Sequence, residues 1–552
     1  MRKAFILLFL AAMVSTTVVG QDFNRLFDGA AIKERVKILS ADNFEGRGPG
    51  NAGSKLAADY IAAQMKLAGI KPGNGKSYFQ NVKLAGIKVD PSTQMRVSGK
   101  GDSVSNFKFG DDFVATTGAQ REGVKIDAEL VFMGYGIESS LYNWNDYGDD
   151  PNAYKGKVLL IMVNDPPATS EEPNLFGGKA LTYNGRWTYK YEEAARRGAA
   201  GVILIHTTPS AGYGWNVVRT SFGGERSEIF RGTDDKTPYL NLMSWMTEDS
   251  VKRIMSQAGI DFDGLRLKAA TRHFRPVNTG LRLAIDLKAT VKTFESPNIV
   301  GVIPGSDKKL KSEYVLYTSH WDHIGVGEPD ATGDRIYNGA YDNASGVAAV
   351  IEVGKVINRL PKNQKPKRSV YFLFPTAEEQ GLLGAEYFAQ KPLIPLNKIA
   401  GNVNMDGVNF FGVTNDFSAL GAERSGVGAM VEAVAAERKL TLEGDMRPEQ
   451  GFFFRSDHFP FAKVGVPAIS LRHGDDFVTP LQGTTLDFFS NYTAKYYHQP
   501  SDQYYEWWNG DAMVQNAELG LAIGLKLANA PTKPRYHTTD EFHAADKKRM
   551  GN

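Results

Sequence analysis

The stretch SVYFLFPTAEEQGLLGAEYFAQ, Ser369–Gln390, carries the pattern that predicts the fold. It begins with a short apolar run of β-branched and aromatic residues, which is typical of a buried strand. The residues from Gly381 to about Gln390 form a predicted helix. Between strand and helix stand two adjacent carboxylates, Glu378 and Glu379.

The same order of elements repeats on both sides of this stretch. Predicted strands are NIVGVIPG, YVLYTS and IAGNVNMD, and a helix is predicted from Ser345 to about Leu360. Such alternation favours an α/β fold, with a mixed, mostly parallel sheet and helices on both faces. In such sheets ligands bind at the carboxyl ends of the strands.

Length and composition set the bounds on domains and partners. A chain of 552 residues exceeds one typical core, so two domains, or one domain with an insertion, are expected. With 42% hydrophobic and 23% charged residues the composition is globular. A formal net charge of +2 argues against nucleic acid as a partner.

The first twenty residues, MRKAFILLFLAAMVSTTVVG, have a basic start, an apolar run and small residues. This order predicts a cleaved signal peptide, because the apolar run is shorter than the roughly 20 residues of a membrane span. We therefore expect a periplasmic or secreted protein with no membrane span. The chain has no cysteine, so any metal site must use His, Asp and Glu.

The middle of the chain has a different pattern. KGKVLLIMVND, from Lys155, predicts a strand, and YEEAARRGAAGVILIHTT, from Tyr191, predicts a helix, a glycine turn and a strand. Residues 114–293 contain no catalytic cluster and are predicted to be an insertion. The main domain would then consist of residues 21–113 and 294–552.

A glycine-rich loop, GRGPGNAG, precedes a predicted helix from about Ser54 to Ala68. The loop lacks the Walker lysine and a preceding strand, so it is predicted to be a turn and not a phosphate site.

Potential metal ligands follow the predicted strands. Each of them alone is more often a helix cap, a solvated charge or a satisfied polar residue. Brought together at one edge of a parallel sheet, the carboxylates would repel unless divalent cations separated them. Two histidines with three carboxylates suit zinc, and two sites would need a bridging carboxylate, for which Asp342 on its loop of small residues is the natural candidate. The residues concerned are His320, Asp322, Asp342, Glu378, Glu379, Asp406 and His498.

Six segments resemble the M28 metallopeptidases, a family that includes secreted bacterial aminopeptidases and the glutamate carboxypeptidases. The resemblance covers about Ser296 to Ala528 and, less fully, Phe44 to Pro72. The middle part resembles the protease-associated domain that many members carry as an insertion. The six segments are SHWDHIG, NGAYDNASG, TAEEQGLLG, NVNMD, SDHFPFAKVGVPAI and YHQPSD.

The resemblance implies a role for each of these residues. Asp342 would bridge two zinc ions, one held also by His320 and Asp406 and the other by Glu379 and His498. Glu378 would be the general base and Asp322 would orient the His320 ring.

The chain departs from the family pattern at two places. Tyr341 replaces an acidic residue beside the predicted bridge. Phe453 stands where some relatives have a tyrosine, so Tyr497 is the candidate that would stabilise the oxyanion.

The implied activity is that of an aminopeptidase, which attacks peptides with a free N-terminus by a hydroxide formed from metal-bound water. Three alternatives stay open: a carboxypeptidase or dipeptidase of the glutamate-carboxypeptidase type, a glutaminyl cyclase-like transferase with one zinc, and a non-catalytic receptor on the same fold. In a carboxypeptidase or dipeptidase, Arg455 or Arg472 would supply the basic pocket that binds the substrate carboxylate. The receptor is disfavoured because no ligand position has been lost. The pattern specifies no oligomeric state.

Overall fold

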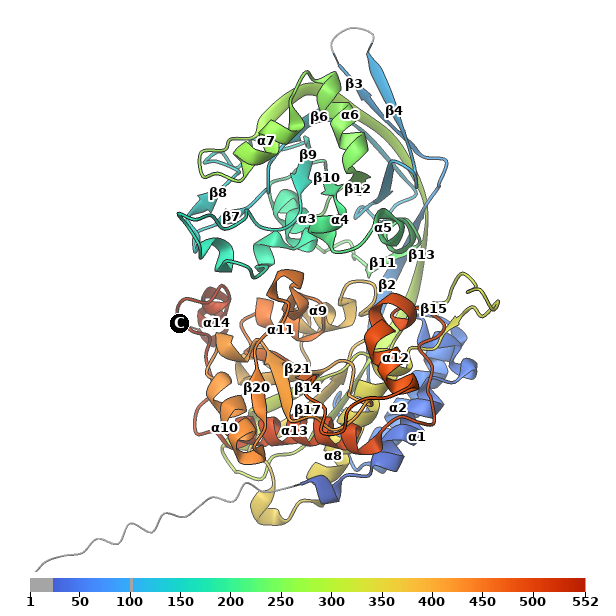
Figure 1. Cartoon of the computed structure of the whole chain (residues 1–552), viewed down its shortest axis with the longest axis vertical. Coiled ribbons are helices and arrows are strands. Elements are labelled where there is room, and N and C mark those ends of the chain that lie inside the picture. Colours follow the sequence, from blue (N-terminus) through green and yellow to red (C-terminus); the bar gives the residue numbers. More distant parts are fainter. Residues whose placement is uncertain (1–22, 100–102, 552) are drawn as a thin grey trace, which may run out of the picture.

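The computed structural model describes residues 23–99 and 103–551. The predicted signal peptide, residues 1–20, lies outside the described residues. Two lobes are joined by one long strand, β13 (Val277–Ile303), which belongs to a sheet in each lobe. In Figure 1 this strand runs along the side of the molecule from the upper lobe into the lower one.

The lower lobe contains the main sheet, whose central strands are parallel. The pairs β17–β14, β14–β18 and β18–β21 run parallel, and the pairs with β13, β2 and β19 are mostly antiparallel. The mixed, mostly parallel sheet predicted from the sequence is thus confirmed. In spatial order the strands are β11 (Arg226–Ile229), β2 (Phe79–Val89), β13, β17 (Ser369–Phe374), β14 (Tyr314–Thr318), β18 (Ile399–Met405), β21 (Ala468–His473), β19 (Asp416–Leu420) and β20 (Thr441–Glu443), with β1 (Lys71–Pro72) on the end of β13.

Helices cover both faces of the main sheet because its strands are apolar on both sides. In β14, for example, Val315 and Tyr317 pack into one core and Leu316 into another. The first core is covered by α1 (Gly29–Leu39), α2 (Ala52–Leu67), α8 (Gly346–Arg359) and α13 (Gly510–Asn529). The second is covered by α9 (Leu383–Gln390) and α11 (His458–Lys463). The remaining helices of this lobe are α10 (Gly428–Arg438), α12 (Thr484–Asn491) and α14 (His543–Met550).

The upper lobe, which we call the second lobe, contains its own sheet and helices. Its order is β4 (Val104–Lys108), β3 (Gln94–Ser98), β13, β6 (Gly123–Phe132), β9 (Val158–Met162), β10 (Gly201–His206), β12 (Leu242–Thr247) and β5 (Phe113–Thr116). Its helices are α3 (Trp187–Arg196), α4 (Thr208–Ala211), α5 (Trp215–Ser221), α6 (Glu248–Gln257) and α7 (Phe262–Ala269). A short ribbon of β7 (Glu138–Ser139) and β8 (Trp144–Asn145) completes this lobe. A second short ribbon, of β15 (Gly325–Val326) and β16 (Ile336–Tyr337), belongs to the lower lobe.

The second lobe differs from the predicted insertion at its edges. Strand β3 pairs with β13 on one side and with β4 on the other, so the sheet of the second lobe takes in residues from Gln94 onward, well before residue 114. The segment NIVGVIPG, predicted as a separate strand, is the continuation of β13 into the main sheet. Alternating inward apolar residues let one strand serve both cores without a break. The identity of the second lobe as a protease-associated domain stays a prediction.

Within residues 23–99 and 103–551, the structure contains no helix with the length and apolar character that crossing a bilayer requires.

Candidate metal centre

The central strands deliver three groups of ligand-type side chains to one edge of the main sheet. Strand β14 leads to His320, β17 to the pair Glu378 and Glu379, and β18 ends just before Asp406. All three strands are parallel neighbours, so their carboxyl ends lie at the same edge.

Asp342 reaches this edge from an irregular turn, Ala340–Ser345, that precedes α8. Its backbone N–H donates to Asp502 Oδ2 at 3.1 Å, and that of Tyr341 donates to Asp502 Oδ1 at 3.0 Å. Gly346 allows the turn to approach β18, because a Cβ at this position would lie 2.4 Å from the carbonyl oxygen of Met405. The peptide bond between Asp342 and Asn343 is cis.

The structure brings the five predicted ligands together in two groups that share Asp342. His320 Nε2 lies 3.2 Å from Asp342 Oδ1 and 3.3 Å from Asp406 Oδ1. On the other side, His498 Nε2 lies 3.4 Å from Asp342 Oδ2 and 3.0 Å from Glu379 Oε2. Each carboxylate oxygen of Asp342 therefore faces a different histidine.

These separations fit donor atoms arranged around metal ions. Zinc binds nitrogen and oxygen at about 2.0–2.2 Å in tetrahedral geometry, which places neighbouring donors about 3.3–3.5 Å apart. His498 Nε2 has no hydrogen-bond partner among the described residues, although Glu379 lies 3.0 Å away. Two further overlapping sets have donor atoms within 4.8 Å of one another: His320, Asp342 and Glu379, and His320, Glu378 and Asp406.

The tautomer of His320 also fits a metal ligand. Its Nδ1 lies 3.2 Å from the carbonyl oxygen of Asp322, which can only accept, so Nδ1 carries a proton and Nε2 is the nitrogen whose lone pair can bind a metal. Burial lowers the pKa of His320, but Glu378, Asp406 and Asp342 outweigh it and raise the pKa well above its ordinary value. A cation at Nε2 would replace the second proton.

The carboxylates at this edge of the sheet carry more negative charge than the histidines can neutralise. Burial raises the pKa of Glu378 well above its ordinary value and that of Asp502 to about 7. Burial acts in the same direction on Glu379, but His498 and His323 hold its pKa at about 2. Bound cations would relieve this crowding. The carboxylates are Asp322, Asp342, Glu378, Glu379, Asp406, Asp457 and Asp502.

Asp322 lies in the centre but contacts different atoms from those expected. The contact to the His320 ring comes from the main-chain carbonyl of Asp322 and not from its carboxylate. Its Oδ1 instead accepts the backbone N–H of Glu378 at 3.2 Å. The carboxylate faces that donor, so Asp322 supports the loop of Glu378 with its side chain and His320 with its backbone.

Tyr497 stacks on the ring of His498, with 3.8 Å between the ring centroids. The residue is 46% exposed, but burial and the charges of Asp342 and Glu379 raise the pKa of its hydroxyl well above the ordinary value, so the hydroxyl lies near the proposed ligands. The position is compatible with the role that the resemblance implies for it.

Three contributing side chains were not assigned this role from the sequence. His323 Nδ1 donates to Glu379 Oε1 at 2.7 Å, Ser456 Oγ donates to Asp406 Oδ2 at 2.6 Å, and Asp502 holds the turn of Asp342. All three lie inside the segments that carry the family resemblance. His323 and Asp502 follow the predicted ligands His320 and His498 by three and four residues, and this short spacing was the signal that the sequence offered.

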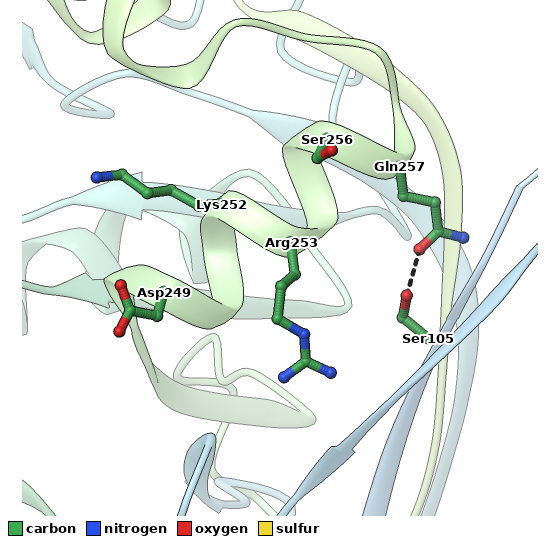
Figure 2. A pocket seen from close by; sticks show the side chains of 6 residues that line it. All are labelled: Ser105, Asp249, Lys252, Arg253, Ser256 and Gln257. Atoms are coloured by element: carbon green, nitrogen blue, oxygen red, sulfur yellow. Dashed lines mark hydrogen bonds between the residues drawn. The ribbon is translucent and has the colours of Figure 1, made fainter.

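A depression in the second lobe offers no competing metal site. Figure 2 shows it between α6 and β4, where Ser105 Oγ donates to Gln257 Oε1 at 2.8 Å. The described residues that line it include one carboxylate, Asp249, and two cations, Lys252 and Arg253.

Comparisons with known proteins agree with the fold. Two curated relatives are a probable leucine aminopeptidase 2 of Aspergillus oryzae, 23% identical over 72% of this chain and 67% of that protein, and carboxypeptidase Q of Pongo abelii, 25% identical over 51% and 57%. The chain spans 24% to 67% of the length of the first five curated relatives that it matches. The solved aminopeptidase from Aneurinibacillus sp. strain AM-1 shares the fold, with a TM-score of 0.50 and 19% identity over 93% of this chain and 96% of that one.

The model of peptidase family M28 matches residues 298–523, the segment that holds His320, Asp342, Glu379, Asp406 and His498. Residues 298–523 are therefore similar to peptidase family M28.

Proposed function

We propose that this protein is an exported aminopeptidase with two zinc ions, which removes N-terminal residues from peptides with a free N-terminus. The observation that carries the proposal is the position of Asp342. Its Oδ1 lies 3.2 Å from His320 and its Oδ2 3.4 Å from His498, which suits one carboxylate shared by two cations.

The ligand assignment follows from the same geometry. His320, Asp406 and Asp342 would hold one zinc ion, and His498, Glu379 and Asp342 the other. When bound, zinc polarises a carbonyl oxygen and lowers the pKa of water.

Glu378 would move the proton in the reaction. Its carboxylate would accept a proton from the attacking water and transfer it to the leaving nitrogen of the peptide. The backbone N–H of Glu378 is held by Asp322 Oδ1, which fixes the loop while the side chain acts. The hydroxyl of Tyr497 would donate to the oxyanion that forms on the scissile carbonyl.

Substrates with one end blocked test the direction of attack. We expect the zinc-loaded protein to release the first residue from a tetrapeptide with a free N-terminus and an amidated C-terminus, and to leave the N-acetylated tetrapeptide with a free C-terminus intact. Glu378→Gln should lower kcat by about 10²–10⁴-fold, the usual contribution of a general base. Glu386→Gln, in α9, is the matched control and should keep wild-type kcat.

One observation favours a second candidate, a carboxypeptidase. Arg472 lies at the end of β21, and its Nε has no hydrogen-bond partner among the described residues. The charge of Arg472 also contributes to the pKa values of Asp406 and Tyr341, so it faces the centre. A substrate carboxylate would be a suitable partner. Cleavage of the N-acetylated peptide from its C-terminus would establish this candidate and remove the aminopeptidase proposal.

A further inference from the structure

Arg47 is a buried arginine whose guanidinium binds only main-chain carbonyls. Its residue is 1% exposed and lies at the end of the segment Asp42–Arg47, in the glycine-rich loop before α2. The hydrogen bonds are Nε to Trp321 O at 2.8 Å, Nη1 to Leu39 O and to Asn338 O at 2.7 Å each, and Nη2 to Gly339 O at 2.8 Å.

Three of these four carbonyls belong to the two loops that supply ligands, and the fourth, Leu39 O, lies at the end of α1. Trp321 stands between His320 and Asp322, and Asn338 and Gly339 immediately precede the turn of Asp342. One planar side chain thus holds the loop after β14 and the loop before α8 at a fixed separation. A guanidinium suits this task because its five N–H donors lie in a rigid fork.

The local backbone is shaped to bring Arg47 to this position. Glu45, Gly46 and Arg47 all have left-handed φ angles, of 48°, 59° and 53°. A Cβ on Gly46 would lie 2.4 Å from the carbonyl oxygen of Tyr337 and 2.6 Å from that of Gly325. The segment therefore docks tightly against β15 and β16, which flank the same two loops.

The charge of Arg47 suits its surroundings. Burial lowers its pKa to about 10, so it remains charged at neutral pH, and Asp322, Asp502 and Asp342 act to keep it so. It is a permanent cation beside a centre that is rich in carboxylates.

We propose that Arg47 is a positioning residue of the metal centre, which sets the distance between His320 and Asp342 by clamping their two loops. The inference rests on the proposed function, because it takes these two residues to be metal ligands. Arg47 contacts neither the ligands' side chains nor the space between them; it acts through the backbone beside them.

The test compares Arg47→Lys with Arg368→Lys. Lysine keeps the charge and loses the fork. Arg368 is also 1% exposed and donates to the carbonyls of Leu527 and Ala530, but its remaining partner is Glu313, before β14 and away from its ligand end. Both substitutions should destabilise the metal-free protein in urea unfolding. Only Arg47→Lys should weaken zinc binding, by about 10–100-fold in equilibrium dialysis at buffered free zinc, the range for residues that support ligands.

Two results would overturn the role of Arg47: wild-type zinc affinity in Arg47→Lys, or an equal loss in Arg368→Lys. Absence of zinc binding by the wild-type protein would instead overturn the proposed function, and this role with it. If Arg47→Lys unfolds without metal, the rate of zinc release from the loaded protein into excess chelator gives the same comparison. Release should be faster in Arg47→Lys and unchanged in Arg368→Lys.

Discussion

Asp502 holds the backbone of Asp342, with Oδ2 accepting the Asp342 N–H at 3.1 Å. Its other oxygen accepts the N–H of Tyr341 at 3.0 Å. Asp502 lies four residues after His498, so the segment YHQPSD supplies one proposed ligand and also the support for another. A carboxylate that accepts two successive amides fixes the turn, and hence the direction of the Asp342 side chain.

We expect Asp502→Asn to weaken zinc binding by about 10–100-fold, as loss of a supporting hydrogen bond does. Asparagine keeps one acceptor and places an N–H₂ group against a backbone N–H, which directs the turn away from its present position. Equilibrium dialysis against buffered zinc measures the effect.

Asp416→Asn is the control for this substitution. Asp416 accepts the successive amides of Asp475 and Asp476 at 3.1 Å and 2.9 Å, away from the proposed ligands. Asp416→Asn should lower the free energy of unfolding by about 1–3 kcal/mol, because a buried backbone N–H loses its acceptor, and should leave the zinc affinity unchanged. Equal zinc affinity in the two variants would refute the role of Asp502.

Arg226, in the edge strand β11 of the main sheet, contacts the loop of the proposed base. Its Nη2 donates to the carbonyl oxygen of Gln380 at 3.1 Å, and the N–H of Ser227 donates to Gln380 Oε1 at 3.2 Å. Gln380 is two residues from Glu378. We expect Arg226→Met to lower kcat about 10–100-fold by displacing the base, with KM little changed.

Arg231→Met separates this effect from a general loss of stability in the segment after β11. Arg231 donates to Gly118 O at 2.9 Å and lies over the Tyr239 ring. Steady-state kinetics at saturating zinc should give wild-type kcat for this variant. If both variants have the same kcat, the contact to Gln380 has no part in catalysis.

Asp146 in the second lobe predicts a pH dependence of stability. It is 3% exposed and accepts hydrogen bonds from Ile137 N and Trp144 Nε1, and burial raises its pKa from 3.8 to about 6. A pKa raised by folding gives stability that is present below the unfolded pKa and is lost as pH rises through the folded one. The loss should be about 3 kcal/mol between about pH 4 and pH 6.

Asp146→Asn removes this titration. The difference in unfolding free energy between wild type and variant, measured in urea, should fall by that amount from pH 4 to about pH 6 and stay constant above about pH 7. A difference that does not change with pH would show that Asp146 does not titrate in this range.

Much of the main lobe could be predicted because its strands are short apolar runs that end in charged residues. YVLYTS, SVYFLFP and IAGNVNMD became β14, β17 and β18, and parallel pairing brought their ends to one edge. The proximity of His320, Glu379 and Asp406 follows from that topology.

The remaining features depend on contacts between distant segments. Arg47 binds carbonyls 274 and 291 residues further along, and main-chain acceptors leave no trace in side-chain patterns. The glycine-rich loop that carries it was predicted to be only a turn. Likewise β13 alternates through both lobes, so its sequence gives no sign of where one sheet ends and the next begins.

The measurement that tests the account most directly is the number of zinc ions bound per chain at saturation, compared between wild type and Asp342→Ala. Because Asp342 faces both His320 and His498, the account predicts two ions in the wild type and fewer than one in the variant, with both proteins folded by circular dichroism. A wild type that binds a single ion, or a variant that still binds two, would contradict it.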